Sequence, residues 1–304
     1  MKTITYGKQN IDSEDIKAVI KILNSVSITQ GEIVNEFGNK IAKFVGAKYG
    51  VAVSSGTAAL HLSLLSLDLK PGDEVITSPI TFCATANSVL YNGADVKLVD
   101  IDPETLNINY KKIEKNITKK TKAILAVHLN GKMTNVIKIK NICKKYKLKF
   151  VEDSAQALGA TYKKISPGQL SDIACFSTHP TKTLFSFRDG GYVVSNNKRL
   201  INRIKLLRNH GIVKNNRDKC DEFGFNSRMD ELQAKILIEK LKELKKIIRL
   251  RNLNANTYYK YLNKKHFHFD SSQTNLVNSY QFFLVLCEKR DQLFKYLNSK
   301  KIMV

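Results

Sequence analysis

The sequence has no apolar segment of the length that a secretory signal or a membrane span requires. Its first residues, MKTITYGKQN, lack the apolar core of a signal peptide, and no apolar run approaches about 18 residues. The five cysteines are widely spaced and include no CxxC pair. We therefore expect a cytoplasmic protein with reduced thiols, no membrane partner and no bound metal.

Several nucleotide-binding and nucleic-acid-binding motifs are also missing. The chain contains no GxGxxG and no P-loop, which disfavours a NAD-linked dehydrogenase. Acidic residues are few: 27 Asp and Glu against 50 Lys and Arg give a formal charge of +23. This charge indicates either a polyanionic partner or a solvated lysine-rich surface. Because no helix-turn-helix, zinc-finger or RNP pattern accompanies the charge, we predict no nucleic-acid partner. Basic charge would still attract an anionic substrate.

Short apolar strands alternate with amphipathic helices through the first half of the chain. This alternation favours an α/β fold with a mostly parallel central sheet. A long helical pattern from Asp230 to about Tyr261 is typical of a helix that connects a large domain to a smaller one. The stretch SYQFFLVLCEKRDQLFKYLNSKKIMV then predicts a strand, a helix and the start of another strand. Helices are predicted over 12–24, 32–46, 57–67 and 135–147, and a further helix begins near residue 82. Strands are predicted over 50–54 and within PGDEVITSP, VKLVDID, TKAILAVHL and LKFVED. The strand in VKLVDID is expected to be buried.

Four polar segments follow predicted strands, where open α/β sheets bind their ligands. In VAVSSGTAAL, Gly56 allows close backbone approach, Thr57 offers a hydroxyl, and the helix N-terminus attracts phosphate. A plain helix cap explains the same residues equally well. In TSPITFCATAN, Phe82 lies where a helix begins and could stack on a flat ring or belong to the core.

The third segment, LKFVEDSAQALGA, ends an apolar strand with a carboxylate. A buried Asp153 is costly unless a cation faces it, and a protonated pyridine nitrogen is such a cation. The alternative for Asp153 is a structural salt bridge. Gln156 lies close enough in sequence to touch the same ring.

The fourth segment, ACFSTHPTKTLFSFRDGGYVVSN, carries a single lysine among Ser, Thr and Phe. A desolvated Lys182 can lose its proton and attack an aldehyde as the free amine, whereas most lysines are simply exposed. Ser177, five residues earlier, could bind phosphate.

Five blocks in this order resemble the DegT/DnrJ/EryC1/StrS sugar aminotransferases, which have the type I pyridoxal-phosphate transferase fold. The blocks are SSGTAALHLSLLSL, TFCATANSVLYNGADVKLVDIDPETLNI, VEDSAQALGA, FSTHPTK and GFNSRMDELQAKIL, and the likeness runs from about residue 4 to 304. The opening TYGKQNIDSEDIKAVIKILNSVSITQG resembles the pseudaminic acid pathway branch, which aminates a UDP-linked 4-keto-6-deoxy-N-acetyl-altrosamine. The resemblance implies a large cofactor-binding domain over 1–245 and an incomplete small C-terminal domain over 246–304.

The resemblance also implies a cofactor, substrates and a role for each site residue. Pyridoxal 5'-phosphate would be the cofactor, glutamate the amino donor, and a UDP- or dTDP-linked keto-sugar the acceptor. Asn226 would reach the phosphate bound by the neighbouring subunit, so a homodimer would share its active sites. Within one chain, the implied roles are cofactor attachment and proton transfer for Lys182, pairing with the ring nitrogen for Asp153, ring contacts for Phe82 and Gln156, and phosphate binding for Gly56, Thr57 and Ser177.

Three features depart from the family pattern. The turn after the lysine reads SFRDGG, with Phe187 and Arg188 at unusual positions, and the segment HLNGKMTN also differs. The chain is moreover shorter than family members. These departures keep a truncated, inactive binding protein of the same fold as an alternative. A sugar dehydratase is another alternative, but those enzymes carry histidine where this chain has Lys182, which favours transamination.

Overall fold

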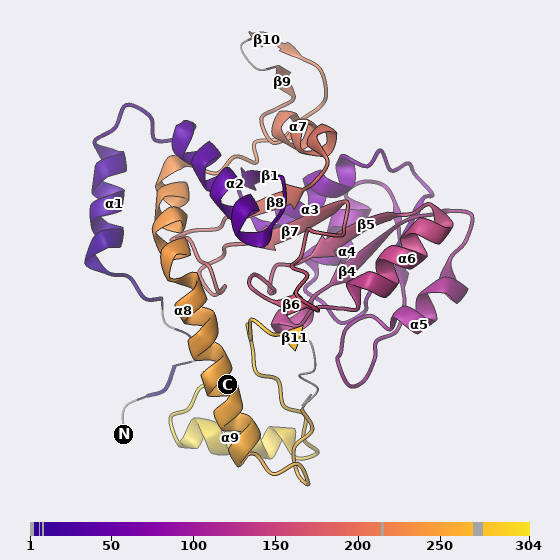
Figure 1. The fold of residues 1–304 in the computed structure, drawn as a ribbon, viewed down its shortest axis with the longest axis vertical. Helices are drawn as coiled ribbons and strands as arrows, with labels where there is room; N and C mark the ends of the chain where they lie inside the picture. The colour runs from indigo at the N-terminus through magenta and orange to yellow at the C-terminus, as the bar shows by residue number, and fades with distance from the viewer. Residues whose placement is uncertain (1–2, 6, 8, 214–215, 270–275) are drawn as a thin grey trace.

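The computed structural model describes residues 3–5, 7, 9–213, 216–269 and 276–304, and its centre is a seven-stranded sheet (Figure 1). The strands lie in the order β1-β8-β7-β5-β4-β2-β3. All neighbours pair in parallel except β8, which is antiparallel to both β1 and β7. The expected mostly parallel sheet is confirmed. The strands are β1 (Tyr49–Val53), β2 (Glu74–Thr77), β3 (Asp95–Leu98), β4 (Thr121–Val127), β5 (Lys149–Asp153), β7 (Ile173–Ser177) and β8 (Gly191–Ser195).

Helices cover both faces of this sheet, because its strands are apolar on both sides. Successive side chains of a strand point to opposite faces. Val51 and Val53 therefore pack with α3, α4 and α7, whereas Ala52 packs with α2 and α8. A third apolar cluster lies under α6. The helices are α1 (Ser13–Leu23), α2 (Glu32–Val45), α3 (Gly56–Leu65), α4 (Ala84–Leu90), α5 (Tyr110–Ile113), α6 (Val136–Tyr146), α7 (Lys198–Leu207), α8 (Glu231–Tyr261) and α9 (Arg290–Ser299).

The long helix α8 begins where the sequence predicts. Asp230 caps it by accepting a hydrogen bond from the Gln233 N–H at 2.8 Å. In the first half of α8, the buried Lys240 forms ion pairs with Asp12 and Asp15, which fixes α1 against α8. The helix runs unbroken past position 245, and the division into two domains there stays a prediction.

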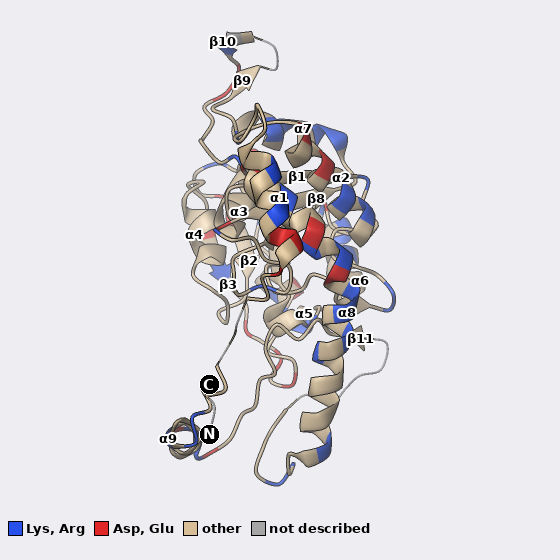
Figure 2. Ribbon diagram, turned by 90° about the vertical axis from the view of Figure 1, so that its left-hand side faces the viewer, with Lys and Arg blue, Asp and Glu red and all other residues tan. Residues whose placement is uncertain are grey.

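Lysines and arginines are spread over many elements of the structure (Figure 2). Acidic side chains lie among them on several helices, as in the pairs Lys17–Glu14 and Lys40–Glu36. This arrangement fits the solvated-surface interpretation of the charge. Among the described residues, none of the helices combines the length and the apolar character that a bilayer span needs.

Two predictions about strands need correction. β3 is not a buried strand: it lies at the edge of the sheet, and Leu98 at its end is 55% exposed. The predicted strand in SYQFFLVLC is wrong as well. Within the described C-terminal residues, β11 (Leu276–Val277) pairs with β6 (Thr161–Tyr162), and the later bridges are isolated ones, Leu286 with His268 and Ile302 with Ile4. The intervening segment bonds to loops near the sheet instead of to a neighbouring strand. Helix α9 is confirmed.

Candidate active site

A cavity of about 500 Å³ opens at the carboxyl ends of β4, β5 and β7 and at the N-terminus of α3. It is the place where an open α/β sheet is expected to bind a ligand. The structure brings seven of the eight predicted site residues to its wall: Gly56, Thr57, Phe82, Asp153, Gln156, Ser177 and Lys182.

Lys182 lies on the loop between β7 and β8, half-buried in this wall. Its backbone N–H donates to the His179 carbonyl at 2.8 Å, which folds the loop into a tight turn. Burial lowers the pKa of the Lys182 amine below its ordinary value, and the nearby Asp153 carboxylate offsets part of that shift. A lysine with a lowered pKa is more often the free amine that attacks a carbonyl carbon.

Asp153 ends β5 and is only 5% exposed. Its carboxylate accepts hydrogen bonds from the Thr85 hydroxyl at 2.7 Å and from the Ala155 N–H at 3.1 Å. It forms no salt bridge with any residue that the structure describes, so the structural salt bridge considered for it is not formed there. A buried carboxylate without a salt-bridge partner is costly, and a protonated ring nitrogen in the cavity would supply such a partner.

The N-terminus of α3 forms a cradle beside Ser177. Ser55 caps the helix by accepting a hydrogen bond from the Ala58 N–H at 3.0 Å. At Gly56 a side chain would collide with the neighbouring strand, because a Cβ atom there would lie 2.7 Å from the Ser177 Cβ. Backbone N–H groups at the start of a helix, next to two hydroxyl side chains, suit a phosphate group.

Phe82 and Gln156 lie on other parts of the same wall. Phe82 is 71% exposed, so the alternative of a core phenylalanine is wrong. The side chain of Gln156 is held in place by a hydrogen bond, which its Oε1 accepts from the Asn130 N–H at 2.6 Å. Both side chains are thus available to the contents of the cavity, although their roles stay predictions.

Asn226 does not line the cavity of its own chain. It is exposed and makes an isolated β-bridge to Asn209. A role in cofactor binding therefore requires a second subunit, as the resemblance implies.

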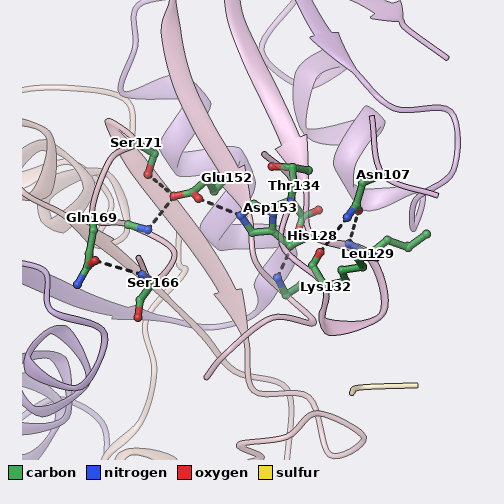
Figure 3. A network of polar contacts seen from close by, with 12 residues as sticks. Asn107, His128, Leu129, Lys132, Thr134, Glu152, Asp153, Ser166, Gln169 and Ser171 are labelled. Atoms are coloured by element: carbon green, nitrogen blue, oxygen red, sulfur yellow. Dashed lines mark hydrogen bonds and ion pairs between the residues drawn. The ribbon is translucent and has the colours of Figure 1, made fainter. Parts of the chain in front are cut away.

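Two groups at or behind the cavity wall are not predicted from the sequence. The first is Thr85, which is fully buried and links the hydroxyl of Thr81, 2.6 Å away, to the Asp153 carboxylate. The second is His128, which lines the cavity, and its partner Glu152 (Figure 3). The one signal in the sequence for the first pair is the four-residue spacing of Thr81, just before α4, and Thr85, in its first turn.

The pair of His128 and Glu152 is completely buried and fully hydrogen-bonded. His128 Nε2 lies 2.9 Å from Glu152 Oε1, and its Nδ1 accepts the Thr134 N–H at 3.1 Å. Nε2 therefore carries the proton that is shared with the carboxylate. The other Glu152 oxygen accepts from the Gly168 N–H at 2.7 Å and from the Ser171 hydroxyl. This network, visible in Figure 3, fixes the loop after β4 against β5.

The unusual SFRDGG turn is held by hydrogen bonds between backbone and side-chain groups. The Phe187 N–H donates to the Gln233 side chain at 2.9 Å, and the Ser186 hydroxyl donates to the Arg188 carbonyl at 2.6 Å. Asp189 reaches the cavity wall. The turn that departs from the family pattern therefore still contributes a residue to the cavity wall.

Comparison with known proteins places the chain in a family. Residues 9–304 match the model of the DegT/DnrJ/EryC1/StrS aminotransferase family, to which the chain belongs. It is 39% identical to a UDP-4-amino-4,6-dideoxy-N-acetyl-beta-L-altrosamine transaminase of Campylobacter jejuni, over 87% of this chain and 71% of that protein. The structure of Helicobacter pylori PseC, an aminotransferase involved in the biosynthesis of pseudoaminic acid, matches with a TM-score of 0.92 at 29% identity, covering 99% of this chain and 83% of PseC.

A further solved structure carries a cofactor. It is NtdA of Bacillus subtilis with bound pyridoxamine phosphate, with a TM-score of 0.87 and 33% identity over 95% of this chain and 68% of that one. The chain described here is a pyridoxal-phosphate-dependent sugar aminotransferase. Its cavity fits that cofactor, because a desolvated amine, a buried carboxylate without a salt-bridge partner and a helix N-terminus line one wall.

Proposed function

We propose that this enzyme transfers the amino group of glutamate to a nucleotide-linked 4-keto-6-deoxy sugar. Glutamate would leave as 2-oxoglutarate, and the sugar ketone would become an amine. The single observation that carries the proposal is that the Lys182 amine and the Asp153 carboxylate share one cavity with the N-terminus of α3.

Each proposed role follows from the chemistry of the side chain. Bound pyridoxal phosphate supplies an aldehyde that captures amines and a ring that accepts the electrons released when the neighbouring C–H bond breaks. Lys182 binds the cofactor and, once displaced, removes and returns the proton at the reacting carbon, because its pKa is already lowered. Asp153 holds the proton on the ring nitrogen. Phe82 covers one ring face, and Gln156 contacts the ring edge.

Phosphate binding is the proposed role of the cradle at α3. Gly56 and Thr57 present the first backbone N–H groups of the helix, and the hydroxyls of Thr57 and Ser177 add donors. The lack of a side chain at Gly56 lets the start of α3 approach Ser177 closely, which brings the helix N–H groups and the serine hydroxyl to one place.

We also propose a homodimer in which Asn226 of one subunit donates to the phosphate bound by the other. Mixing two variants tests this arrangement. Lys182→Ala and Asn226→Ala subunits would each form impaired homodimers, but a mixed dimer would contain one site with both residues intact. Recovery of activity on mixing supports shared sites, whereas activity no higher than that of the two separate variants contradicts them.

The proposed acceptor is a UDP-linked 4-keto-6-deoxy-N-acetyl sugar, on the likeness to the Campylobacter jejuni transaminase. The experiment is incubation with glutamate and a panel of UDP- and dTDP-linked keto-sugars, with mass spectrometry of the sugar and an assay for 2-oxoglutarate. The expected result is an amino sugar formed in equal amount to 2-oxoglutarate, and formed by the wild type but not by Lys182→Ala. A dehydrated sugar without 2-oxoglutarate would instead indicate the dehydratase alternative.

A further inference from the structure

A segment from the C-terminal part of the chain crosses the loop that carries Lys182. Within it, Gln281 is only 5% exposed. Its side-chain Nε2 donates to the Thr181 carbonyl at 2.6 Å, and its Oε1 accepts from the Thr183 hydroxyl at 3.3 Å. One carboxamide thus bridges the residues immediately before and after Lys182, from a position about a hundred residues away in sequence.

The backbone around Gln281 is anchored on two sides. Toward the site, the Ser279 N–H donates to the Gly131 carbonyl and its hydroxyl donates to the Gln156 carbonyl, both at 3.0 Å. Toward helix α8, Arg251 Nη1 donates to the Tyr280 carbonyl at 2.6 Å. These contacts hold the backbone beside Gln281 in place, so that its carboxamide can restrain the loop to which it is hydrogen-bonded.

We propose that Gln281 is a positioning residue that holds the loop 181–183 so that the Lys182 amine faces the cavity. The bridge satisfies a backbone acceptor and a side-chain donor on the two sides of the lysine, which removes the freedom of the loop to rotate the lysine outward. The inference rests on the proposed role of Lys182. It also gives the C-terminal part of the chain a direct part in preparing the amine, distinct from any contact with the sugar.

The clearest perturbation is Gln281→Leu, which keeps the approximate volume and removes both polar atoms. The loss leaves the Thr181 carbonyl without this donor and lets the loop sample other conformations. Because a displacement of about 1 Å at a reacting group can cost up to about a hundredfold in rate, and one lost buried hydrogen bond about tenfold, we expect cofactor attachment to slow by at least about tenfold. A second variant, Gln281→Glu, keeps the shape and the acceptor but loses the donor, and should also be slowed.

The measurement is the rate at which the apoprotein attaches pyridoxal phosphate, with borohydride quenching at successive times and mass spectrometry of the peptide that contains residue 182. The visible circular dichroism of the bound cofactor gives a second readout of how rigidly it is held. Gln9→Leu is the matched control, since Gln9 also bonds this loop, at the Pro180 carbonyl, but is exposed and 3.3 Å away. That control should change the rate by less than about twofold.

The outcomes separate this inference from the proposed function. Attachment at Lys182 in the wild type, slowed in both Gln281 variants and unchanged in Gln9→Leu, supports it. Equal rates and equal dichroism in wild type and both Gln281 variants overturn it while leaving the role of Lys182 standing. Wild-type attachment at another lysine overturns both. The unfolding midpoint of each variant is measured as well, to separate a loss of stability from a loss of positioning. A variant that is less stable but still almost fully folded would attach the cofactor at the wild-type rate.

Discussion

The hydrogen bond between Thr85 and Asp153 makes a quantitative prediction about the carboxylate of the site. Thr85 is fully buried, and its hydroxyl lies 2.7 Å from Asp153 Oδ2. Thr85→Val keeps the shape of the side chain and removes the donor. Since a hydrogen bond to a charged group contributes about 1.5–3 kcal/mol, the free energy of unfolding should fall by about 2 kcal/mol. Thr85→Ser, which keeps the hydroxyl, should recover most of this loss.

A double-mutant cycle isolates the contact from the other effects of each change. Urea unfolding of the apoprotein is measured for the wild type, Thr85→Val, Asp153→Ala and the double variant. The predicted coupling is about 2 kcal/mol, because Thr85→Val costs little once the carboxylate is gone. A coupling below about 0.5 kcal/mol, the level found for independent sites, would refute the idea that this threonine supports the carboxylate.

Other predictions concern the remaining parts of the site. Asp153→Asn removes the negative charge that raises the Lys182 pKa, so the pH midpoint for labelling the Lys182 amine in the apoprotein should move down; a midpoint that moves up would contradict the assignment. Gly56→Ala forces a Cβ to within 2.7 Å of the Ser177 Cβ, so it should cost about 1–3 kcal/mol of stability and weaken cofactor binding, as measured by unfolding and by spectroscopic titration. Asn226→Ala should change monomer stability by less than about 0.5 kcal/mol yet weaken cofactor binding several-fold. Equal cofactor affinity in that variant would remove Asn226 from the site.

The sequence predicts the main site residues because each follows a strand of the same sheet. Asp153 ends β5, Ser177 ends β7, and Gly56 starts the helix after β1. The carboxyl ends of parallel strands meet at one edge of the sheet, so local patterns are enough to predict that these residues lie close together. Helices are predictable for a similar reason, because caps such as Asp230 are local signals in the sequence.

The contacts that support the site could not be predicted in this way. Thr85 meets Asp153 across 68 positions, and Gln281 meets Thr181 across 100. Which side chains meet over such separations depends on tertiary packing, which carries no local signature. The two wrong strand predictions have the same cause. An apolar run in the sequence does not distinguish an edge strand such as β3 from a central strand. It also does not distinguish a strand from an apolar loop such as the one around Gln281, which is hydrogen-bonded to residues near the site.

The most direct test of the central claim is to find the lysine that carries the cofactor. The protein is saturated with pyridoxal phosphate, reduced with borohydride, digested and mapped by mass spectrometry. We predict the reduced cofactor on Lys182 alone, with the visible absorption of the lysine-bound cofactor absent in Lys182→Ala. Modification of a different lysine, or an unchanged absorption band in Lys182→Ala, would contradict it.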